Sequence, residues 1–253
     1  MIRKGDSYRA EKVELVPELT SAMFADGSWE KQEFKKFNPE AKGLDIENGN
    51  LHLLMKTRQQ FVEILLEMGF EEMKTDRYVE SSFWNFDALF QPQAHPARDA
   101  HDTFFISHPA SGKVEDQTYF NAVKQIHEKG GFGSRGYDYE WEPQEAYKNL
   151  LRTHTTAISS QYLKQIASEK PFKPHKFFSI DRVFRNETLD NTHLAEFHQV
   201  EGFVIDRNLG LNHLIGILSE FYKKIGIDKI WFKPTYNPYT EPSMEIFGKQ
   251  FVT

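Results

Sequence analysis

The sequence predicts an α+β fold in which helices flank a mostly antiparallel β-sheet. Two segments show the three-to-four residue spacing of apolar side chains that is typical of amphipathic helices, and several shorter runs alternate as strands do. The strand-like runs follow each other as hairpins instead of being separated by regular helical crossovers, which favours antiparallel pairing. With 253 residues, the chain is long enough to bury a sizeable core as one large domain with an extension.

Composition narrows the class of protein. The formal net charge of −6 gives no overall attraction for nucleic acid. The sequence contains no cysteine, which excludes disulfides and thiolate zinc sites. It also contains no apolar run of the roughly 20 residues needed to cross a bilayer, and its first six residues lack the apolar stretch of a signal peptide. These features predict a cytoplasmic protein without a membrane association.

The first half of the chain divides near residue 50. Residues 1–50 are polar and punctuated by proline and glycine, so we expect an N-terminal extension or linker. Apolar residues from Leu51 to Met68 follow helical spacing, Gly69 is well placed to cap this helix, and a strand is expected from Phe70. Residues 81–106 are predicted to form strands and loops. The glycine-rich segment 130–136 lacks the Gly-Lys-Ser/Thr ending of a phosphate-binding loop, so an ordinary loop is expected there.

The second half alternates helices with strands. Apolar periodicity predicts a further clear helix that is ended by Gly226, and no internal repeat is present. The expected helices are 143–151, 157–169 and 211–225, and the expected strands are 176–180, 182–187, 197–204, 230–233 and 244–247.

One hairpin carries an unusual set of polar side chains. Arg185 and Glu187 are two residues apart on an expected strand, so they share a face; on the following strand Phe197, Gln199 and Glu201 share a face. Half-buried charges are costly unless each finds a partner, which favours a ligand-binding surface. Spacing alone is equally consistent with a pair of edge strands that has a solvated charged face.

Residues 183–202, VFRNETLDNTHLAEFHQVEG, resemble motif 2 of class II aminoacyl-tRNA synthetases. The full string is similar to the α subunits of phenylalanyl-tRNA synthetases in particular. Segments 83–89, 95–104, 151–156 and 237–243 also resemble these subunits in their eukaryotic and archaeal form. The resemblance covers roughly residues 50–253 and implies a class II synthetase catalytic domain over residues 51–253.

Two departures from the family pattern bear on this expectation. Arg77 stands where motif 1 of class II enzymes usually carries a proline. The chain stops at Thr253, before the family's motif 3 with its second ATP-binding arginine, and it lacks the family's N-terminal RNA-binding modules. We therefore expect a fragment that lacks motif 3 and is inactive alone.

The resemblance implies a phenylalanine–tRNA ligase. Such an enzyme activates L-phenylalanine with ATP to the adenylate and transfers it to tRNA(Phe); it uses Mg²⁺ and works as an assembly of two α and two β subunits. An alternative stays open: a non-catalytic fragment or paralogue that acts as an amino-acid-binding or assembly module. Retention of the motif residues favours the enzyme, whereas the missing motif 3 favours the alternative.

At the ATP end of the implied site, the resemblance assigns catalysis to Arg185 and Glu187. The planar guanidinium of Arg185 would hold two oxygens of the α-phosphate. Glu187 would orient that arginine or accept from the adenine amino group, with a simple strand salt bridge as the alternative. His193 would contact the pyrophosphate end, or would be an exposed loop histidine.

At the amino acid end, the resemblance implies that the stretch of Gln199, Val200 and Glu201 contacts phenylalanine. An amide and a carboxylate on one strand face suit an α-ammonium group. His154 and Thr156 would complete this part of the site.

Three further expectations concern single residues. Thr155 or Thr156 would be a good N-cap for the helix expected after them, which is compatible with a binding role. Tyr239 is implied to lie against the aromatic ring of the substrate. Glu241 is implied to hold Mg²⁺ together with the β subunit, although the sequence around it alone indicates a turn residue.

Overall fold

The computed structural model describes residues 5, 8, 14–38, 40–41, 43, 49–237 and 240–248. The chain forms two compact units, Met1–Asn50 and Leu51–Thr253. Among the helices of the described part, none combines the length and the apolarity needed to cross a membrane.

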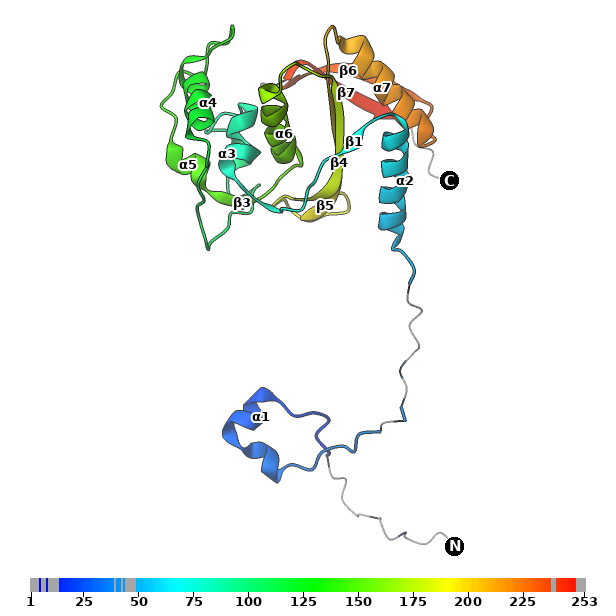
Figure 1. Cartoon of the computed structure of the whole chain (residues 1–253). Helices are drawn as coiled ribbons and strands as arrows, with labels where there is room; N and C mark the ends of the chain where they lie inside the picture. The colour runs from blue at the N-terminus through cyan, green and yellow to red at the C-terminus, as the bar shows by residue number, and fades with distance from the viewer. Residues whose placement is uncertain are drawn as a thin grey trace. The chain divides into compact units, whose positions relative to one another are not determined.

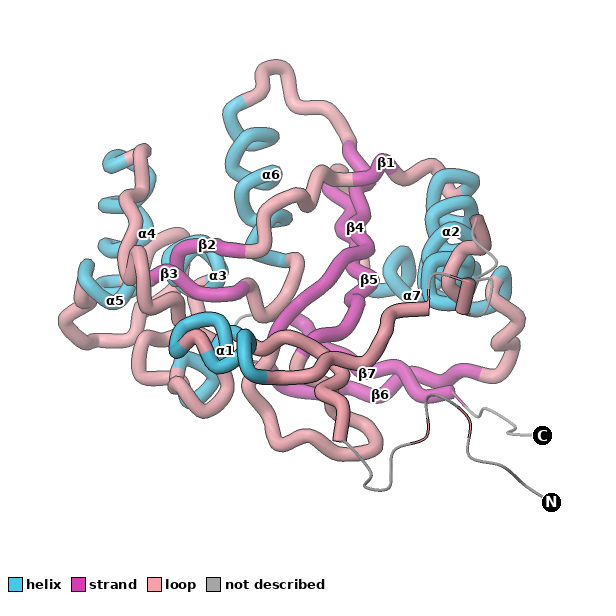
Figure 2. The backbone as a smooth tube through the Cα atoms, turned by 90° about the horizontal axis from the view of Figure 1, so that it is seen from below, coloured by secondary structure: helices cyan, strands magenta, loops and turns pink. Residues whose placement is uncertain are grey.

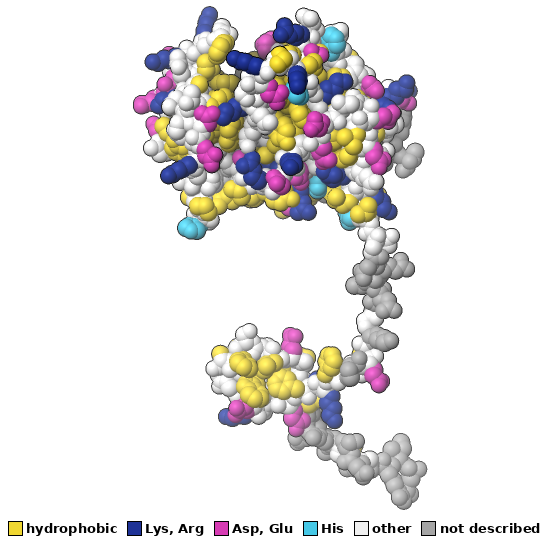
Figure 3. All heavy atoms as spheres, in the orientation of Figure 1, with side chains coloured by type: hydrophobic (Ala, Val, Ile, Leu, Met, Phe, Trp, Pro, Cys, Tyr) yellow, Lys and Arg dark blue, Asp and Glu magenta, His cyan; other side chains and the backbone are white. Residues whose placement is uncertain are grey.

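The smaller unit is built on two short helical turns. Helix α1 (Ser21–Asp26) is capped by the hydroxyl of Thr20 and is followed by the 3-10 turn η1 (Ser28–Lys31). Val16 and Phe34 form an isolated parallel bridge. Hydrophobic side chains gather on the surface of this unit (Figure 3), and its exposed large apolar residues include Leu15, Leu19, Phe24, Trp29 and Phe37.

The larger unit alternates helices and strands around a central hairpin (Figure 1). Its helices are α2 (Leu53–Glu67), α3 (Ser82–Asn85), α4 (Gln117–Lys129), α5 (Pro143–Tyr147), α6 (Thr156–Ser168) and α7 (Leu211–Lys224), with 3-10 turns η2 (Asp87–Leu89) and η3 (Pro96–Arg98). Its strands are β1 (Glu71–Glu72), β2 (Val79–Ser81), β3 (Asn149–Leu151), β4 (His175–Phe184), β5 (Glu196–Ile205), β6 (Ile230–Asn237) and β7 (Thr240–Gly248).

The central sheet has the strand order β1-β4-β5. Strands β4 and β5 pair antiparallel in an unbroken register from His175↔Ile205 to Phe184↔Glu196, and β1 joins β4 in parallel. Two further antiparallel pairs, β2 with β3 and β6 with β7, complete the described strands. The predicted α+β architecture with mostly antiparallel pairing is therefore confirmed.

The two faces of the central sheet pack against different helices. Phe177 on β4 contacts Ile158 and Ile166 of α6, whereas Phe178 and Ile180 contact the apolar side chains of α2 and α7. Figure 2 shows β4 and β5 between α6 on one side and α2 with α7 on the other. Because the side chains of a strand alternate, the face that looks toward α6 also carries the polar residues of β5.

A separate aromatic core joins α3, α4 and α5. Phe83, Phe120 and Trp141 are buried within it. The rings of Phe120 and Tyr147 stack with centroids 5.0 Å apart and planes within 5°. This core fixes the segment that follows β2, which forms one wall of the candidate site.

The expected helices over 51–68 and 211–225 are confirmed as α2 and α7, and Gly69 and Gly226 follow them with φ of +81° and +87°. Strand β5 and the loop over 130–136 are confirmed as well. The strands expected at 230–233 and 244–247 belong to the longer hairpin of β6 and β7.

Three local predictions were wrong. Residues 82–89 form the helical turns α3 and η2 instead of strands and loops, because the hydroxyl of Ser81 accepts from the backbone N–H of Trp84 and starts a turn. Residues 149–151 form strand β3, which pairs with β2, instead of ending a helix. Strand β4 is continuous and ends at Phe184, so Arg185 follows the strand rather than lying on it.

Candidate active site

A cavity of about 600 Å³ opens between the end of β4, the start of α6 and the segment that follows α3. Five of the residues expected from the sequence line it: His154, Thr156, Arg185, Glu187 and Gln199. The remaining lining residues are Phe86, Leu89, Gln91, His95, Ala97, Asp102, Thr153 and Thr240.

Arg185 provides the positive charge of the cavity. Its Nε donates to the backbone oxygen of Thr153 at 3.3 Å, and its guanidinium carbon lies 5.2 Å from the ring centroid of Phe197. Glu187 Oε1 is 3.9 Å from Arg185 Nη1, and both side chains are more than a third exposed. A contact of this length in solvent is weak, so most N–H donors of the guanidinium stay available for an anion.

Glu201 organises the other end of the site. Its carboxylate accepts from the hydroxyls of Thr156 at 2.6 Å, Ser159 at 2.7 Å and Thr155 at 3.1 Å, and from Gln199 Nε2 at 3.3 Å. The three hydroxyls stand at the beginning of α6, where the helix dipole favours a negative charge. Glu201 therefore fixes the start of α6 to β5, and a ligand ammonium group would have to share the carboxylate with these hydroxyls.

Thr155 occupies the N-cap position of α6 that was predicted for it or Thr156, but its hydroxyl does not cap the helix. Thr155 is the N-cap residue of α6, yet its side chain makes no hydrogen bond to the helix backbone. Its hydroxyl is directed to Glu201 instead.

Two residues that line the cavity each have a buried polar atom without a hydrogen-bond partner among the described residues: Nδ1 of His154 and Oε1 of Gln199. Burial lowers the pKa of His154 to about 4, and the positive charge of Arg185 acts in the same direction. The imidazole is therefore neutral at pH 7. Unpartnered buried polar atoms are uncommon in folded proteins, so their occurrence on two residues that line one cavity points to a ligand that supplies the partners.

A buried arginine anchors the backbone that enters the site. Arg152 is fully buried; it forms an ion pair of 2.9 Å with Asp181 and donates to the backbone oxygens of Thr75, Arg77 and Arg182. The cavity-lining residues Thr153 and His154 follow it directly. Arg152 therefore ties the polar face of the sheet to the loop before β2.

Other expected residues lie elsewhere. His193 sits on the exposed loop between β4 and β5, where its Nδ1 is 2.9 Å from both carboxylate oxygens of Asp190, and this hydrogen bond raises the pKa of the imidazole. His193 Nε2 is 3.8 Å from Glu187, but the residue does not line the cavity. Val200 points to the opposite face of β5 from Gln199, because neighbouring side chains of a strand alternate, and its side chain does not reach the cavity.

Val200 and Glu241 both line a second hollow of about 650 Å³, an apolar groove between β5, α7 and β7. Glu241 is exposed there beside apolar neighbours such as Ile246. No group of three or more His, Asp or Glu side chains suited to a metal ion occurs in the described part of the chain. A magnesium role for Glu241, shared with a β subunit, stays a prediction. Tyr239 lies outside the described residues.

Most of the lining residues that sequence reasoning missed come from one wall of the cavity. Phe86, Gln91, His95 and Ala97 lie on the segment after α3, which had been expected to be strand and loop. The local signal that could have indicated them was the concentration of polar side chains around Pro92 and Pro96.

Comparison with known proteins shows which family the chain belongs to. Residues 36–251 match the family model of the class II tRNA synthetase core domain (F). The chain belongs to this family of class II synthetase core domains, which confirms the predicted fold class. A crystal structure of pyrrolysyl-tRNA synthetase from Desulfitobacterium hafniense superimposes with a TM-score of 0.53 at 13% identity, over 77% of this chain and 55% of that one, and shares the fold.

Curated relatives are much closer in sequence. The phenylalanine–tRNA ligase alpha subunit of Gallus gallus is 58% identical over 98% of this chain and 56% of its own length. Those of Danio rerio and Homo sapiens are 57% and 56% identical over 98% of this chain, and over 50% and 49% of their own lengths. The chain thus spans about half the length of the curated relatives it matches.

Proposed function

We propose that this chain carries the catalytic core of a phenylalanine–tRNA ligase α subunit, which joins L-phenylalanine to tRNA(Phe) through an adenylate made from ATP. Its high identity to curated alpha subunits of this ligase supports the proposal. The structural observation that carries it is one cavity lined by the cation of Arg185 and by two residues with unpartnered buried atoms, His154 and Gln199.

The first reaction step needs little covalent chemistry from the protein. A carboxylate oxygen of phenylalanine attacks the α-phosphate of ATP, the bond to the β-phosphate oxygen breaks, and pyrophosphate leaves. Arg185 would hold the α-phosphate oxygens while charge builds on them, with Glu187 keeping the guanidinium in place. Positioning and charge neutralisation dominate such transfers.

The amino acid would bind at the start of α6. Oε1 of Gln199 would accept a hydrogen bond from the α-ammonium group, and the nearby Glu201 would balance its charge. The apolar side chains of Phe86, Leu89 and Ala97 give the same cavity a wall suited to an uncharged ring. This combination favours phenylalanine over amino acids with a polar side chain.

Cofactor, partners and location follow from the same proposal. ATP would enter with Mg²⁺, whose ligands in nucleotide sites are mostly phosphate oxygens and water, and Glu241 together with the β subunit would supply a carboxylate ligand. The relatives are named alpha subunits, which supports a partner β subunit. We further propose an assembly of two α and two β chains that acts on tRNA in the cytoplasm.

The experiment is phenylalanine-dependent ATP–pyrophosphate exchange by the complete α subunit together with β. Arg185→Ala should lower the exchange rate by about 100-fold or more, because a preorganised donor to the developing charge is lost. Arg182→Ala is the matched control, since Arg182 is exposed, lies outside the cavity and pairs with Glu196 at 3.4 Å. Exchange near the wild-type rate in Arg185→Ala would give Arg185 a structural role.

Ligand specificity has its own test. Thermal-shift measurements with phenylalanine, tyrosine and histidine should show stabilisation by phenylalanine alone. Equal shifts with all three would contradict the assigned substrate. Binding of phenylalanine without any exchange would instead identify an amino-acid-binding module.

A further inference from the structure

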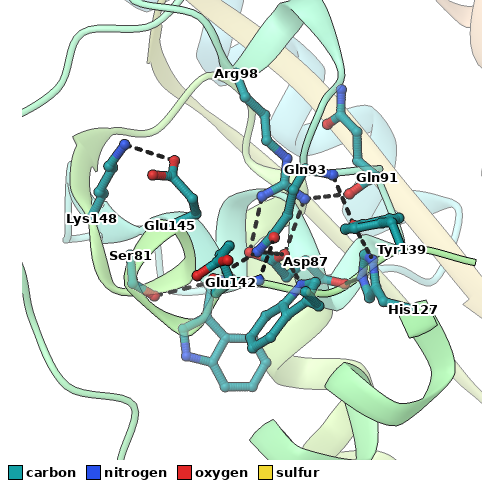
Figure 4. A network of polar contacts seen from close by, with 12 residues as sticks. Ser81, Asp87, Gln91, Gln93, Arg98, His127, Tyr139, Glu142, Glu145 and Lys148 are labelled. Carbon is teal, nitrogen blue, oxygen red and sulfur yellow. Dashed lines mark hydrogen bonds and ion pairs between the residues drawn. The ribbon is translucent and has the colours of Figure 1, made fainter. Parts of the chain in front are cut away.

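A buried ion pair stands behind one wall of the cavity. Arg98 Nη1 and Nη2 lie 3.0 and 3.1 Å from the two carboxylate oxygens of Asp87, whose side chain is 0% exposed while that of Arg98 is 7% exposed. Trp141 Nε1 donates to the same carboxylate at 2.7 Å, and Gln93 Nε2 does so at 3.4 Å. Figure 4 shows Arg98 and Gln93 beside Asp87 in this network.

Both carboxylate oxygens of Asp87 and both Nη atoms of Arg98 are hydrogen-bonded, whereas the buried Nε of Arg98 has no partner among the described residues. His127 Nε2 donates to the backbone oxygen of Asp87 at 2.8 Å. Burial lowers the pKa of His127, so its ring is neutral and places no second cation next to Arg98. Arg98 is therefore the cation that the carboxylate of Asp87 holds in place.

Arg98 connects this pair to the cavity. Its guanidinium carbon lies 5.0 Å from the ring centroid of Phe86, and its Nη2 also donates to the backbone oxygen of Gln91. Both of these residues line the cavity. Asp87 directly follows Phe86, and Arg98 directly follows the lining residue Ala97. One ion pair thus ties together both ends of the wall.

The same wall carries a histidine of defined tautomer. The backbone N–H of Ala97 donates to His95 Nδ1 at 3.2 Å, and Gln91 Nε2 lies 2.9 Å from the same atom. Since a backbone N–H can only donate, Nδ1 is unprotonated and the ring proton of the neutral form sits on Nε2. Nε2 of this cavity-lining histidine has no hydrogen-bond partner in the described part of the chain.

From these contacts we infer that the Asp87–Arg98 pair is a positioning device for ligand binding. It holds Phe86, Gln91 and His95 in one arrangement, with His95 offering Nε2–H as a neutral donor to the ligand in the cavity. Asp87 and Arg98 are positioning residues that do not themselves touch the ligand. The inference rests on the proposed function for the identity of the ligands, phenylalanine and ATP.

The test compares Arg98→Lys and Asp87→Asn with the wild type in the complex of the complete α subunit with β. Arg98→Lys keeps the charge but loses the two-pronged contact, and Asp87→Asn keeps the shape but loses the charge. Both should lower kcat/KM for pyrophosphate exchange by about 10- to 100-fold, the effect of misplacing binding groups by about 1 Å. Glu145→Gln, which removes the exposed pair of Glu145 with Lys148, should leave kcat/KM within about twofold.

General destabilisation is separated from positioning by two further measurements. Leu65→Ala truncates a core residue on the opposite face of the sheet; at an equal loss in Tm it should leave kcat/KM within about twofold. The ¹⁵N spectrum of the His95 ring should show a single Nε2-protonated tautomer in the wild type and a mixture in Arg98→Ala or, if that variant does not fold, in Arg98→Lys.

Equal kinetic losses in Arg98→Lys and Leu65→Ala at matched Tm, or an unchanged His95 spectrum, would overturn the inference. A wild-type complex without phenylalanine-dependent exchange would instead refute the proposed function, and the His95 spectrum would still decide whether Arg98 positions the wall.

Discussion

Replacing Glu201 by alanine should destabilise the protein strongly. The substitution removes the acceptor of three hydroxyls. Two of the residues that carry these hydroxyls, Thr155 and Ser159, are 0% and 2% exposed. A buried donor without a partner costs about 1–3 kcal/mol, so this pair would cost about 2–6 kcal/mol. Part is regained because a carboxylate no longer has to be desolvated, and we expect a loss of about 2–4 kcal/mol.

The assay is urea denaturation of the 253-residue chain, read as a lower midpoint at an unchanged m-value. Glu201→Gln, which keeps one acceptor oxygen, should fall between the wild type and Glu201→Ala. Ser168→Ala is the matched control at the other end of α6, because Ser168 is exposed and its hydroxyl bonds only the backbone oxygen of Gln165. A loss below about 1 kcal/mol in Glu201→Ala would refute the view that Glu201 holds the start of α6 to β5.

Two further predictions concern acidification and a glycine turn. Burial holds the pKa of His154 at about 4, below its ordinary value of 6.5. On acidification the unfolded chain therefore binds this proton before the folded chain does. The free energy of unfolding should accordingly fall by about 2 kcal/mol between about pH 7.5 and about pH 5. His154→Gln should remove that contribution, and an unchanged pH dependence of urea midpoints would contradict it. A Cβ on Gly130 (φ +75°) would meet the backbone oxygen of Ser134 at 2.2 Å, whereas one on Gly133 (φ +92°) would meet nothing within 4 Å. Gly130→Ala should therefore be less stable than Gly133→Ala by about 1 kcal/mol or more; equal Tm values would refute the clash.

The elements with a strong local signal were predictable. Helices α2 and α7 carry long apolar stripes that end at glycines with positive φ, and the polar face of β5 follows from simple alternation. The same alternation correctly separated Gln199 and Glu201 from Val200. The family resemblance then directed attention to five residues that the structure brings into one cavity.

What failed depended on partners far away in the sequence. Strand β3 has only three residues, and its conformation is fixed by pairing with β2, about 70 residues earlier. Asp87 accepts a hydrogen bond from Trp141, 54 residues away, and no local sequence pattern predicts that contact.

The anchoring of Arg152 has a kinetic consequence. The fully buried side chain ties the loop before β2, the polar face of β4 and the entry to residues 153–156 into one cooperative unit. The binding groups after it therefore cannot open without breaking much of the domain, and little ordering is left to occur when a ligand arrives. Ligand association should accordingly run close to the rate of diffusional encounter, with selectivity expressed in how slowly the correct amino acid leaves.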